Sequence, residues 1–414
     1  MKIKCVFWLG VSWLSLVFAS PNFAQWVPVG PGFNLHVEAM TVYKNSLYAG
    51  GWFDTSGQNT ASKVAKWEGS NWSAVGDEIN DFVFALEVFH DTLFAGGAYT
   101  HAFRGVAKLE GNKWRRAGLG FNGSARCLLV YKDKLIASGA FSEAGDRPAN
   151  FIAGFDGANW TNLGDGTNGP VYALAIWNGD LYAGGAFTKA GSQPVGYIAK
   201  WDGGNWSAVG PGLPNSICAI TVYENTLFAG GWFPGSVAKW NGSNWVQVGA
   251  GLKYSVRTLT IHQNELYAGG GFDKHVAKWD GNAWQTVFDG TNGLITSFLS
   301  LSNDLYAGGS FTLASNASAL RIAKLTVPFG TTELNQKKAA FYPNPMEKEA
   351  TLSLAAPDWG NWEMTISSVL GQPVQKSFFT GKTATIRREN WPPGVYFYKV
   401  TGKDLNLNGK FVAR

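Results

Sequence analysis

A five-residue string, Leu then an aromatic residue then Ala-Gly-Gly, recurs along most of the chain and limits what it can fold into. The string begins at Leu47, Leu93, Leu181, Leu227, Leu266 and Leu305, with a variant, Leu-Ile-Ala-Ser-Gly, at Leu135. The spacings are 46, 42, 46, 46, 39 and 39 residues. This is the period of one four-stranded propeller blade, and it is too long for a leucine-rich or ankyrin unit. The repeat therefore predicts an all-β chain with a seven-bladed β-propeller.

Each unit has room for four short strands joined by tight turns. In the first unit we expect strands at residues 37–43, 47–53 and 64–67, and a fourth centred on Trp72. Asn45 and Gly69 lie between them, and such residues tolerate the positive φ that hairpin turns require. The 52 Gly, 19 Trp and 27 Phe of the chain fit many short strands better than helices.

The last unit lacks a fourth strand. After Leu305 it continues through Ile322-Ala323-Lys324-Leu325, but the expected Gly and Trp do not follow. Residues 25–30 read Gln-Trp-Val-Pro-Val-Gly and match the fourth strand that begins at Trp206. We therefore predict that the N-terminal strand completes the last blade and closes the ring, which removes two exposed sheet edges.

A Trp recurs at the fourth-strand position of every unit. Stacked aromatic side chains can form a sugar platform, but recurrence in every blade favours packing between blades. The residues concerned are Trp26, Trp72, Trp114, Trp160, Trp206, Trp245 and Trp284.

Residues 1–24 have the features of a secretory signal peptide. Lys2 and Lys4 precede an apolar stretch at residues 5–19, and small and polar residues lead to a cleavage site after Ala24. A membrane anchor is the alternative, but the apolar run is shorter than the roughly 20 residues that span a bilayer. No later stretch is longer, so we expect no transmembrane span in the mature chain.

Charge, cysteine and histidine content argue against several classes of function. The chain has 34 Lys and Arg against 29 Asp and Glu, without a basic patch in the repeats, so we expect no nucleic-acid partner. Cys127 and Cys218 fall in units that are not neighbours, which favours buried thiols over a disulfide. The five His residues are scattered without metal-motif spacing, and we expect no metal and no cofactor. The Asp-Gly-Thr-Asn-Gly strings at Asp165 and Asp289 favour turns over calcium or phosphate loops.

The sequence pattern changes after residue 327. Residues 328–339 are a predicted linker, and residues 340–414 contain no Gly-Gly string. Their short apolar runs, separated by Gly and Pro, predict a small antiparallel β-sandwich domain. Motif residues of this domain are Pro343, Asn344, Pro345, Gly371, Gly394, Tyr396 and Lys410.

Two resemblances follow from these motifs. The repeats, at residues 25–327, resemble the kelch-like propeller repeats of bacterial surface proteins and of fungal cell-polarity markers. The order of motifs at residues 340–414 resembles the C-terminal sorting domain of type IX secretion cargo in Bacteroidota. This second resemblance implies export through the periplasm, recognition by the type IX machinery, and a secreted or cell-surface location. An ordinary terminal sandwich domain is the alternative.

The repeats differ most at one position, nine residues before each string. It holds Glu38, Phe84, Arg126, Tyr172, Cys218, Arg257 and Thr296, whereas the next residue is always small. We expect this variable ring at the mouth of the channel, on the same face as the loops between second and third strands. A uniform scaffold that carries diverse loops is typical of a binding face. Glu38, Phe84, Arg126, Tyr172 and Arg257 are therefore candidate ligand-binding residues.

No catalytic motif accompanies these residues, so the sequence favours a non-catalytic scaffold that binds a glycan or protein through one loop face. A secreted glycan-active enzyme is the rival, but it would need two carboxylates at the mouth, and the variable ring offers only Glu38. A structural or adhesive surface component is the third possibility.

Overall fold

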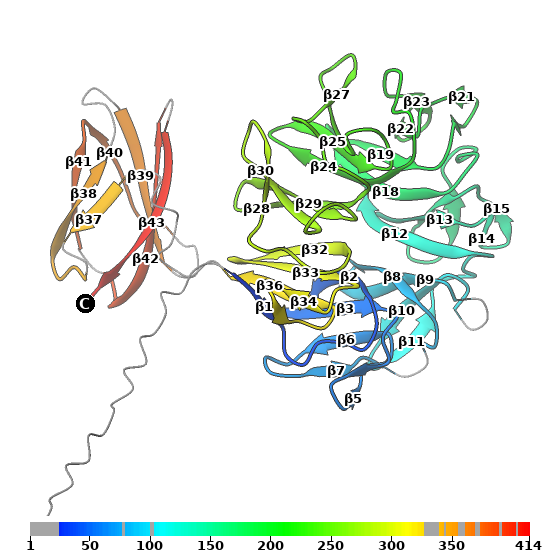
Figure 1. The fold of residues 1–414 in the computed structure, drawn as a ribbon, viewed down its shortest axis with the longest axis horizontal. Coiled ribbons are helices and arrows are strands. Elements are labelled where there is room, and N and C mark those ends of the chain that lie inside the picture. The colour runs from blue at the N-terminus through cyan, green and yellow to red at the C-terminus, as the bar shows by residue number, and fades with distance from the viewer. Residues whose placement is uncertain are drawn as a thin grey trace, which may run out of the picture. The chain divides into compact units, whose positions relative to one another are not determined.

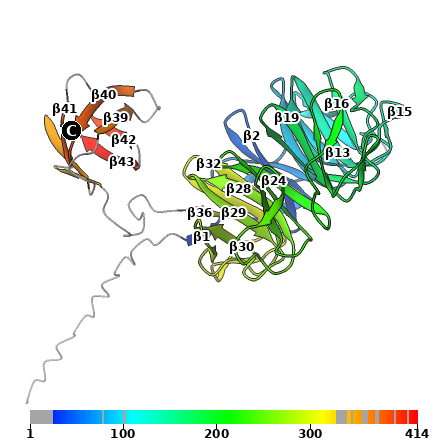
Figure 2. The same ribbon diagram turned by 90° about the horizontal axis from the view of Figure 1, so that it is seen from above.

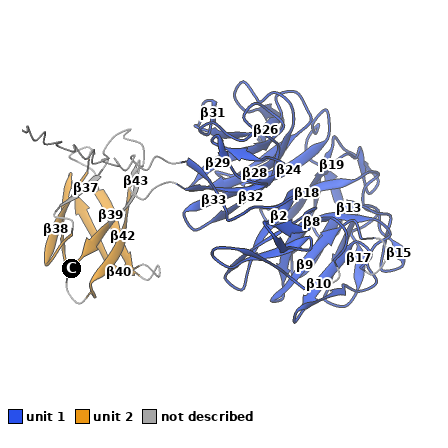
Figure 3. Cartoon of the chain, turned by 60° about the horizontal axis from the view of Figure 1, so that its bottom comes forward, with its two compact units in different colours: residues 1–328 blue, residues 329–414 orange. Residues whose placement is uncertain are grey.

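The computed structural model describes residues 25–76, 79–99, 103–326, 339–342, 345–354, 361–368, 373–388, 391–402 and 405–414. These residues form strands, turns and loops and contain no helix (Figures 1 and 2). The all-β prediction is therefore confirmed. The chain divides into two compact units, residues 1–328 and 329–414, which are coloured separately in Figure 3.

The described part of the first unit contains seven four-stranded antiparallel sheets, numbered here 1 to 7 by the order of their first strands. Sheet 1 has strands β2 (Val37–Tyr43), β3 (Ser46–Gly51), β6 (Val64–Trp67) and β7 (Trp72–Ala74); sheet 2 has β8 (Val83–Phe89), β9 (Thr92–Gly97), β10 (Val106–Glu110) and β11 (Lys113–Arg116). Sheet 3 has β12 (Ser124–Tyr131), β13 (Lys134–Ala140), β16 (Ile152–Phe155) and β17 (Trp160–Asn162); sheet 4 has β18 (Val171–Trp177), β19 (Asp180–Gly185), β22 (Ile198–Trp201) and β23 (Trp206–Ala208). Sheet 5 has β24 (Ile217–Tyr223), β25 (Thr226–Gly231), β26 (Val237–Trp240) and β27 (Trp245–Gln247); sheet 6 has β28 (Val256–His262), β29 (Glu265–Gly270), β30 (Val276–Trp279) and β31 (Trp284–Thr286); and sheet 7 has β32 (Ile295–Leu301), β33 (Asp304–Gly309), β36 (Ile322–Thr326) and β1 (Gln25–Pro28).

Each sheet is a meander whose first strand lies toward the centre of the unit (Figure 3). Six sheets use consecutive stretches of chain, and sheet 7 takes its fourth strand, β1, from the beginning of the described chain. Such sequence-consecutive four-stranded sheets are consistent with a propeller.

The Gly-Gly string is the second strand of each sheet, and its second glycine explains why the string is so constant. A Cβ atom at Gly185 would lie 2.1 Å from the carbonyl oxygen of Pro170, just before β18. Only glycine allows the two backbones to approach this closely. The Leu and Ala of the strings are buried in the same strands.

The recurrent Trp residues link neighbouring sheets. In sheets 1 to 6 the indole Nε1 donates a hydrogen bond to a carbonyl at or just beyond the end of the fourth strand of the preceding sheet. The pairs are Trp72 to Val29 (3.1 Å), Trp114 to Val75 (2.7 Å), Trp160 to Ala117 (2.8 Å), Trp206 to Leu163 (2.8 Å), Trp245 to Val209 (3.2 Å) and Trp284 to Val248 (3.1 Å). The structure thus assigns these side chains to packing between sheets, as the recurrence predicts.

Sheets 1 and 7 contact each other in the same ways as sheets that are consecutive in the chain. The Trp72 hydrogen bond reaches Val29, directly after β1. The Thr296 hydroxyl of β32 donates to the Val37 carbonyl of β2 at 2.8 Å. A Cβ atom at Gly308 of β33 would lie 2.6 Å from Val37 Cγ1, and Gly184 faces Ile217 of the next sheet at 2.7 Å in the same manner.

Short two-stranded ribbons extend the connection between the second and third strands in four sheets. They are β4 (Thr55–Ser56) with β5 (Asn59–Thr60), β14 (Glu143–Ala144) with β15 (Arg147–Pro148), β20 (Lys189–Ala190) with β21 (Gln193–Pro194), and β34 (Leu313–Ala314) with β35 (Ala317–Ser318). An Asn side chain in the loop that enters each of these sheets accepts two backbone N–H bonds from the residues where the ribbon begins. The four are Asn34, Asn122, Asn168 and Asn292. Asn168 and Asn292 belong to the Asp-Gly-Thr-Asn-Gly strings, so these strings stabilise the loops through hydrogen bonds to the ribbon backbone.

The second unit consists of two antiparallel sheets. One has the strand order β37 (Ala339–Tyr342), β38 (Glu349–Leu354), β41 (Thr383–Arg387), and the other has the order β40 (Pro373–Thr380), β39 (Asn361–Ser368), β42 (Gly394–Gly402), β43 (Leu405–Ala413). Strand β38 alternates exposed and buried residues, as expected when one face of a sheet is covered. Leu352 of β38 and Ile366 of β39 are fully buried in one hydrophobic cluster that both sheets supply.

Candidate functional site

All five candidate residues line one cavity of about 450 Å3 in the first unit. Each of the seven first strands contributes to it, and the variable position supplies one lining residue per sheet: Glu38, Phe84, Arg126, Tyr172, Cys218, Arg257 and Thr296. The structure therefore brings together the whole variable ring. We call this space the mouth cavity.

A β-bulge explains why the variable position points into the cavity. In every first strand the pairing register shifts across this residue, as between Val37 and Ala39 in β2 or between Val256 and Thr258 in β28. A bulge leaves one residue outside the ladder and re-aims its side chain. The residue at this position is thus not part of the strand pairing, so its side chain can vary without disturbing the fold.

The two arginines of the cavity stack on aromatic rings. The Arg126 guanidinium lies 4.5 Å from the centre of the Phe84 ring, and that of Arg257 lies 5.0 Å from the Trp232 ring. Both arginines are exposed, and no salt bridge joins either one to a carboxylate of the described residues. Their N–H edges are therefore available to a ligand.

Trp232 lines the cavity and was missed by the sequence reasoning. It directly follows the Gly-Gly string of β25, and 53% of its surface is exposed. The corresponding residue is Trp52 in sheet 1 but Ala98 and Ala140 in sheets 2 and 3. A comparison of the repeats at this second variable position would have found it.

Glu38 is the carboxylate of the mouth cavity, and its surroundings favour the protonated form. Burial raises the pKa of Glu38 above its ordinary value, while the nearby charges of Arg126 and Arg257 and a hydrogen bond from Thr296 offset part of that rise. The carboxylate is thus held where its charge is poorly solvated, with two positive charges as compensation.

This environment gives a pH prediction for Glu38→Gln. A carboxyl whose pKa is raised by folding costs stability as the pH increases above its unfolded value of about 4.3. Below that pH the carboxyl is protonated in both the folded and the unfolded protein, so it does not reduce the free energy of unfolding. We therefore expect the variant to have a higher free energy of unfolding than the wild type at pH 7, and the same value near pH 3.5. Urea denaturation across this range measures the difference, and parallel curves at every pH would contradict the prediction.

The two thiols also line the cavity, and neither is in a disulfide. Burial raises the pKa of Cys127 to about 12 and also raises the pKa of Cys218. Both side chains are protonated at neutral pH, so they form part of the wall and are poor nucleophiles.

No group of three or more His, Cys, Asp or Glu side chains in the described part of the chain gathers closely enough to hold a metal ion. The described histidines have other contacts: His36 stacks on Trp52 with ring centres 5.0 Å apart, and His275 Nδ1 lies 2.9 Å from the Gly270 carbonyl oxygen.

Several apolar side chains that lie outside the four-stranded sheets of the first unit are exposed. The residues are Leu35, Leu119, Trp232, Tyr254, Phe288, Leu313 and Leu320, with Tyr254 76% exposed. Trp232 is the member of this group that lines the mouth cavity.

The sorting-motif residues of the second unit fall partly within the described chain. Tyr396 is buried, donates a hydrogen bond from its hydroxyl to the Pro392 carbonyl at 2.7 Å, and stacks on Phe411. Gly394 begins β42, and Lys410 pairs with Phe397 in the β42–β43 ladder. Pro345 is exposed. Pro343, Asn344 and Gly371 lie outside the described residues, as do the predicted signal peptide at 1–24 and residues 328–338 of the predicted linker.

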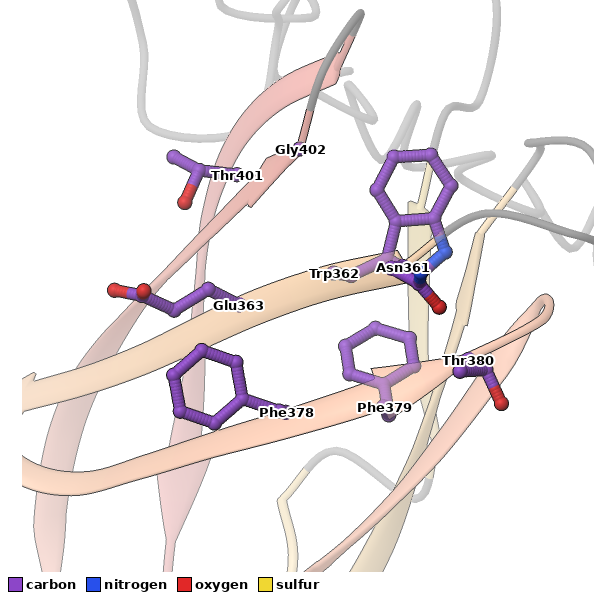
Figure 4. Close-up of a pocket in the computed structure, with 8 residues that line it drawn as sticks. All are labelled: Asn361, Trp362, Glu363, Phe378, Phe379, Thr380, Thr401 and Gly402. Atoms are coloured by element: carbon purple, nitrogen blue, oxygen red, sulfur yellow. The ribbon is translucent and has the colours of Figure 1, made fainter.

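The second unit has its own open cavity, of about 710 Å3, over strands β39 and β40 (Figure 4). Figure 4 shows Trp362, Phe378 and Phe379 beside it. Trp362 is mostly buried and donates from Nε1 to the Gly381 carbonyl at 2.8 Å, whereas Phe378 is 74% exposed.

None of the described residues forms a helix with the length and hydropathy required to cross a bilayer. No curated protein sequence matches the chain.

Solved structures resemble the chain at low sequence identity. The extracellular domain of a putative one-component system from B. thetaiotaomicron is 12% identical with a TM-score of 0.50, over 94% of this chain and 59% of that chain. At this identity the likeness concerns the all-β, propeller-like fold alone. PorZ, a surface component of the type IX secretion system of Porphyromonas gingivalis, is 14% identical with a TM-score of 0.33, over 91% and 70% of the two chains. The computationally designed protein Ika8 is 14% identical with a TM-score of 0.48, over 73% and 100%.

The family model for the secretion system C-terminal sorting domain matches residues 340–414, the range that the motifs predict. The sorting-domain prediction is thereby confirmed, and a domain of this kind implies an interaction with the secretion machinery. The chain carries the C-terminal tail of type IX secretion cargo and is exported to a secreted or outer-surface location.

Proposed function

We propose that this cargo is a closed, seven-bladed, kelch-like propeller that binds an extracellular glycan or protein at the mouth cavity and catalyses no reaction. The observation that carries the proposal is the set of seven bulge residues, which differ from sheet to sheet and line one cavity within a uniform frame. Diversity confined to such positions is what a binding site on a scaffold requires.

Closure of the ring is supported by the contacts between sheets 1 and 7. Strand β1 pairs with β36 from Gln25 opposite Thr326 to Pro28 opposite Ala323. The hydrogen bonds from Trp72 to Val29 and from Thr296 to Val37 then join the two sheets as other neighbours are joined. The pairing covers one edge of β1 and one edge of β36, both of which would otherwise be exposed.

The proposed route out of the cell has two steps. Residues 1–24 act as a signal peptide that takes the chain across the inner membrane of a Bacteroidota-type host. The sorting domain at residues 340–414 then directs the folded cargo across the outer membrane. Release or attachment at the cell surface follows.

A glycan-active enzyme is the alternative, and the cavity favours binding over catalysis. A glycosidase needs two carboxyl groups about 5 to 10 Å apart. Glu38 is the single carboxylate among the described residues that line the mouth cavity. A structural or adhesive component, the third possibility, would engage a partner through the outer strands of the sheets.

The test is a glycan and polysaccharide array probed with the purified protein and with Phe84→Ala and Tyr172→Ala. We expect each variant to lose about tenfold or more in affinity for the bound ligand, since an aromatic contact at a binding site contributes on the order of 1.4 kcal/mol. Lys113→Gln, at the exposed start of β11 at the opposite end of sheet 2, is the control. Unchanged binding in both alanine variants would contradict a mouth site, and release of reducing ends from the ligand would favour the enzyme.

A further inference from the structure

Several cations of the first unit pair with a carboxylate, whereas the two arginines of the mouth cavity form no salt bridge within the described residues. Lys66 lies 3.0 Å from Glu68, Lys200 lies 3.0 Å from Asp180, and Arg104 lies 3.1 Å from Asp146. Arg126 and Arg257 have aromatic faces as neighbours and make no such salt bridge within the described residues. A guanidinium that stacks by its face keeps its in-plane N–H donors for a second partner.

The charges that line the cavity do not balance. Arg126 and Arg257 supply two positive charges, and Glu38 is the carboxylate that faces them among the described lining residues. Burial raises the pKa of Glu38, which further favours its neutral form over its charged form. An anionic group placed between the arginines would meet a favourable field in a partly enclosed site, where charges are less screened than in water.

The aromatic residues indicate the kind of molecule that would carry the anionic group. Phe84, Tyr172 and Trp232 line the same cavity, and Trp232 remains half exposed beside Arg257. A pyranose ring presents a flat apolar C–H face to an aromatic ring, while a carboxylate or sulfate on its edge can accept paired N–H bonds from a guanidinium. A cavity of about 450 Å3 lies within the usual size range of small-ligand sites.

We propose that the mouth cavity recognises an acidic glycan, with Arg126 and Arg257 binding its carboxylate or sulfate groups and the aromatic side chains packing on its sugar rings. This inference rests on the proposed binding function and names the ligand class. An acidic peptide fits the cavity less well, because a flexible carboxylate side chain would reach the arginines but leave the aromatic faces uncovered.

The experiment uses matched pairs of oligosaccharides with the purified full-length protein. Each uronic acid oligomer is compared with its methyl ester, and each sulfated oligomer with its desulfated form. We expect at least one acidic member to bind, and its neutral partner to bind at least tenfold more weakly. Arg126→Gln and Arg257→Gln should each reduce affinity for the acid by about tenfold or more, as expected when a charged hydrogen-bonding partner is lost. Both side chains are exposed in the cavity, so folding should be preserved, and thermal unfolding checks this.

Lys113→Gln removes one positive charge from the opposite end of the unit and should bind as the wild type does. Equal affinity for an acid and its neutral partner would overturn the acidic-glycan proposal but leave the mouth site intact, provided that Phe84→Ala still weakens binding. Arginine-dependent binding of oligoglutamate, with no acidic glycan bound, would replace the glycan with an acidic protein segment. Binding of any of these probes that none of the cavity variants alters would overturn both this proposal and the proposed function.

Discussion

A chain shortened by residues 340–414 is expected to accumulate in the periplasm and to be almost absent from the cell surface and the medium. The removed segment is the part that matches the sorting-domain family, and the two units form separate compact bodies. The first unit should therefore still fold, while the signal for crossing the outer membrane is lost. Cell fractionation and immunoblotting of a host with a type IX system measure the result.

A matched host that lacks the type IX machinery provides the control. There the full-length protein should show the same periplasmic accumulation as the truncated protein in the competent host. Secretion of the truncated protein at the level of the full-length protein would contradict the role assigned to residues 340–414. Thermal unfolding of the purified truncated protein tests whether its absence from the surface results from misfolding and degradation. If the truncated protein is folded and only retained, its unfolding should resemble that of the first unit in the full-length chain.

Trp26→Ala is expected to lower the free energy of unfolding of the first unit by about 3 to 5 kcal/mol, the usual cost of removing a large buried aromatic side chain. Trp26 is 1% exposed and belongs to a cluster with Leu305 and Leu325 of sheet 7. If β1 holds the ring closed, this strand is stabilising even though it is a four-residue segment at the edge of the unit. Chemical denaturation followed by Trp fluorescence measures the loss.

Trp72→Ala is the matched comparison, because Trp72 occupies the same repeat position inside a sheet made of consecutive chain. It is equally buried, but its Nε1 donates to Val29, whereas Trp26 Nε1 has no partner. We expect Trp72→Ala to cost at least as much as Trp26→Ala. A loss of less than 1 kcal/mol for Trp26→Ala alone would show that β1 is not needed to hold the unit together.

The repeat predicted the strands well because it records backbone requirements that every sheet shares. A Gly such as Gly185 is required by the close approach of a carbonyl, and a Trp such as Trp160 is required by packing against the preceding sheet. These demands are local and recur in each unit. A single chain therefore contains seven examples of them, and the pattern can be read without other sequences.

The candidate site was predictable for a related reason. The bulge in each first strand frees one side chain from the ladder, so that position varies while its neighbours stay constant, and Glu38 and Tyr172 could be identified from that contrast. The stacking of Arg257 on Trp232 could not, because it depends on how a loop residue of one sheet meets a bulge residue of the next. The role of Asn168 was also not predicted, because its side chain accepts hydrogen bonds from backbone groups that are about 20 residues away in the chain.

In the second unit an aromatic residue that precedes Pro392-Pro393-Gly394 adds to the core. Trp391 is 8% exposed and packs against Tyr396 and Phe411. The extra aromatic side chain thus enlarges the hydrophobic core of this small domain.

The pairing of β1 with β36 also fixes an order of events in time. Gln25 is synthesised about 300 residues before its partner Thr326. Until then Trp26 has no sheet to join, and sheet 7 lacks its fourth strand however many of the other sheets have formed. Such distant pairings form late and slowly. The last sheet of the first unit therefore waits for the end of that unit to be synthesised, although its fourth strand, β1, is made before every other described strand.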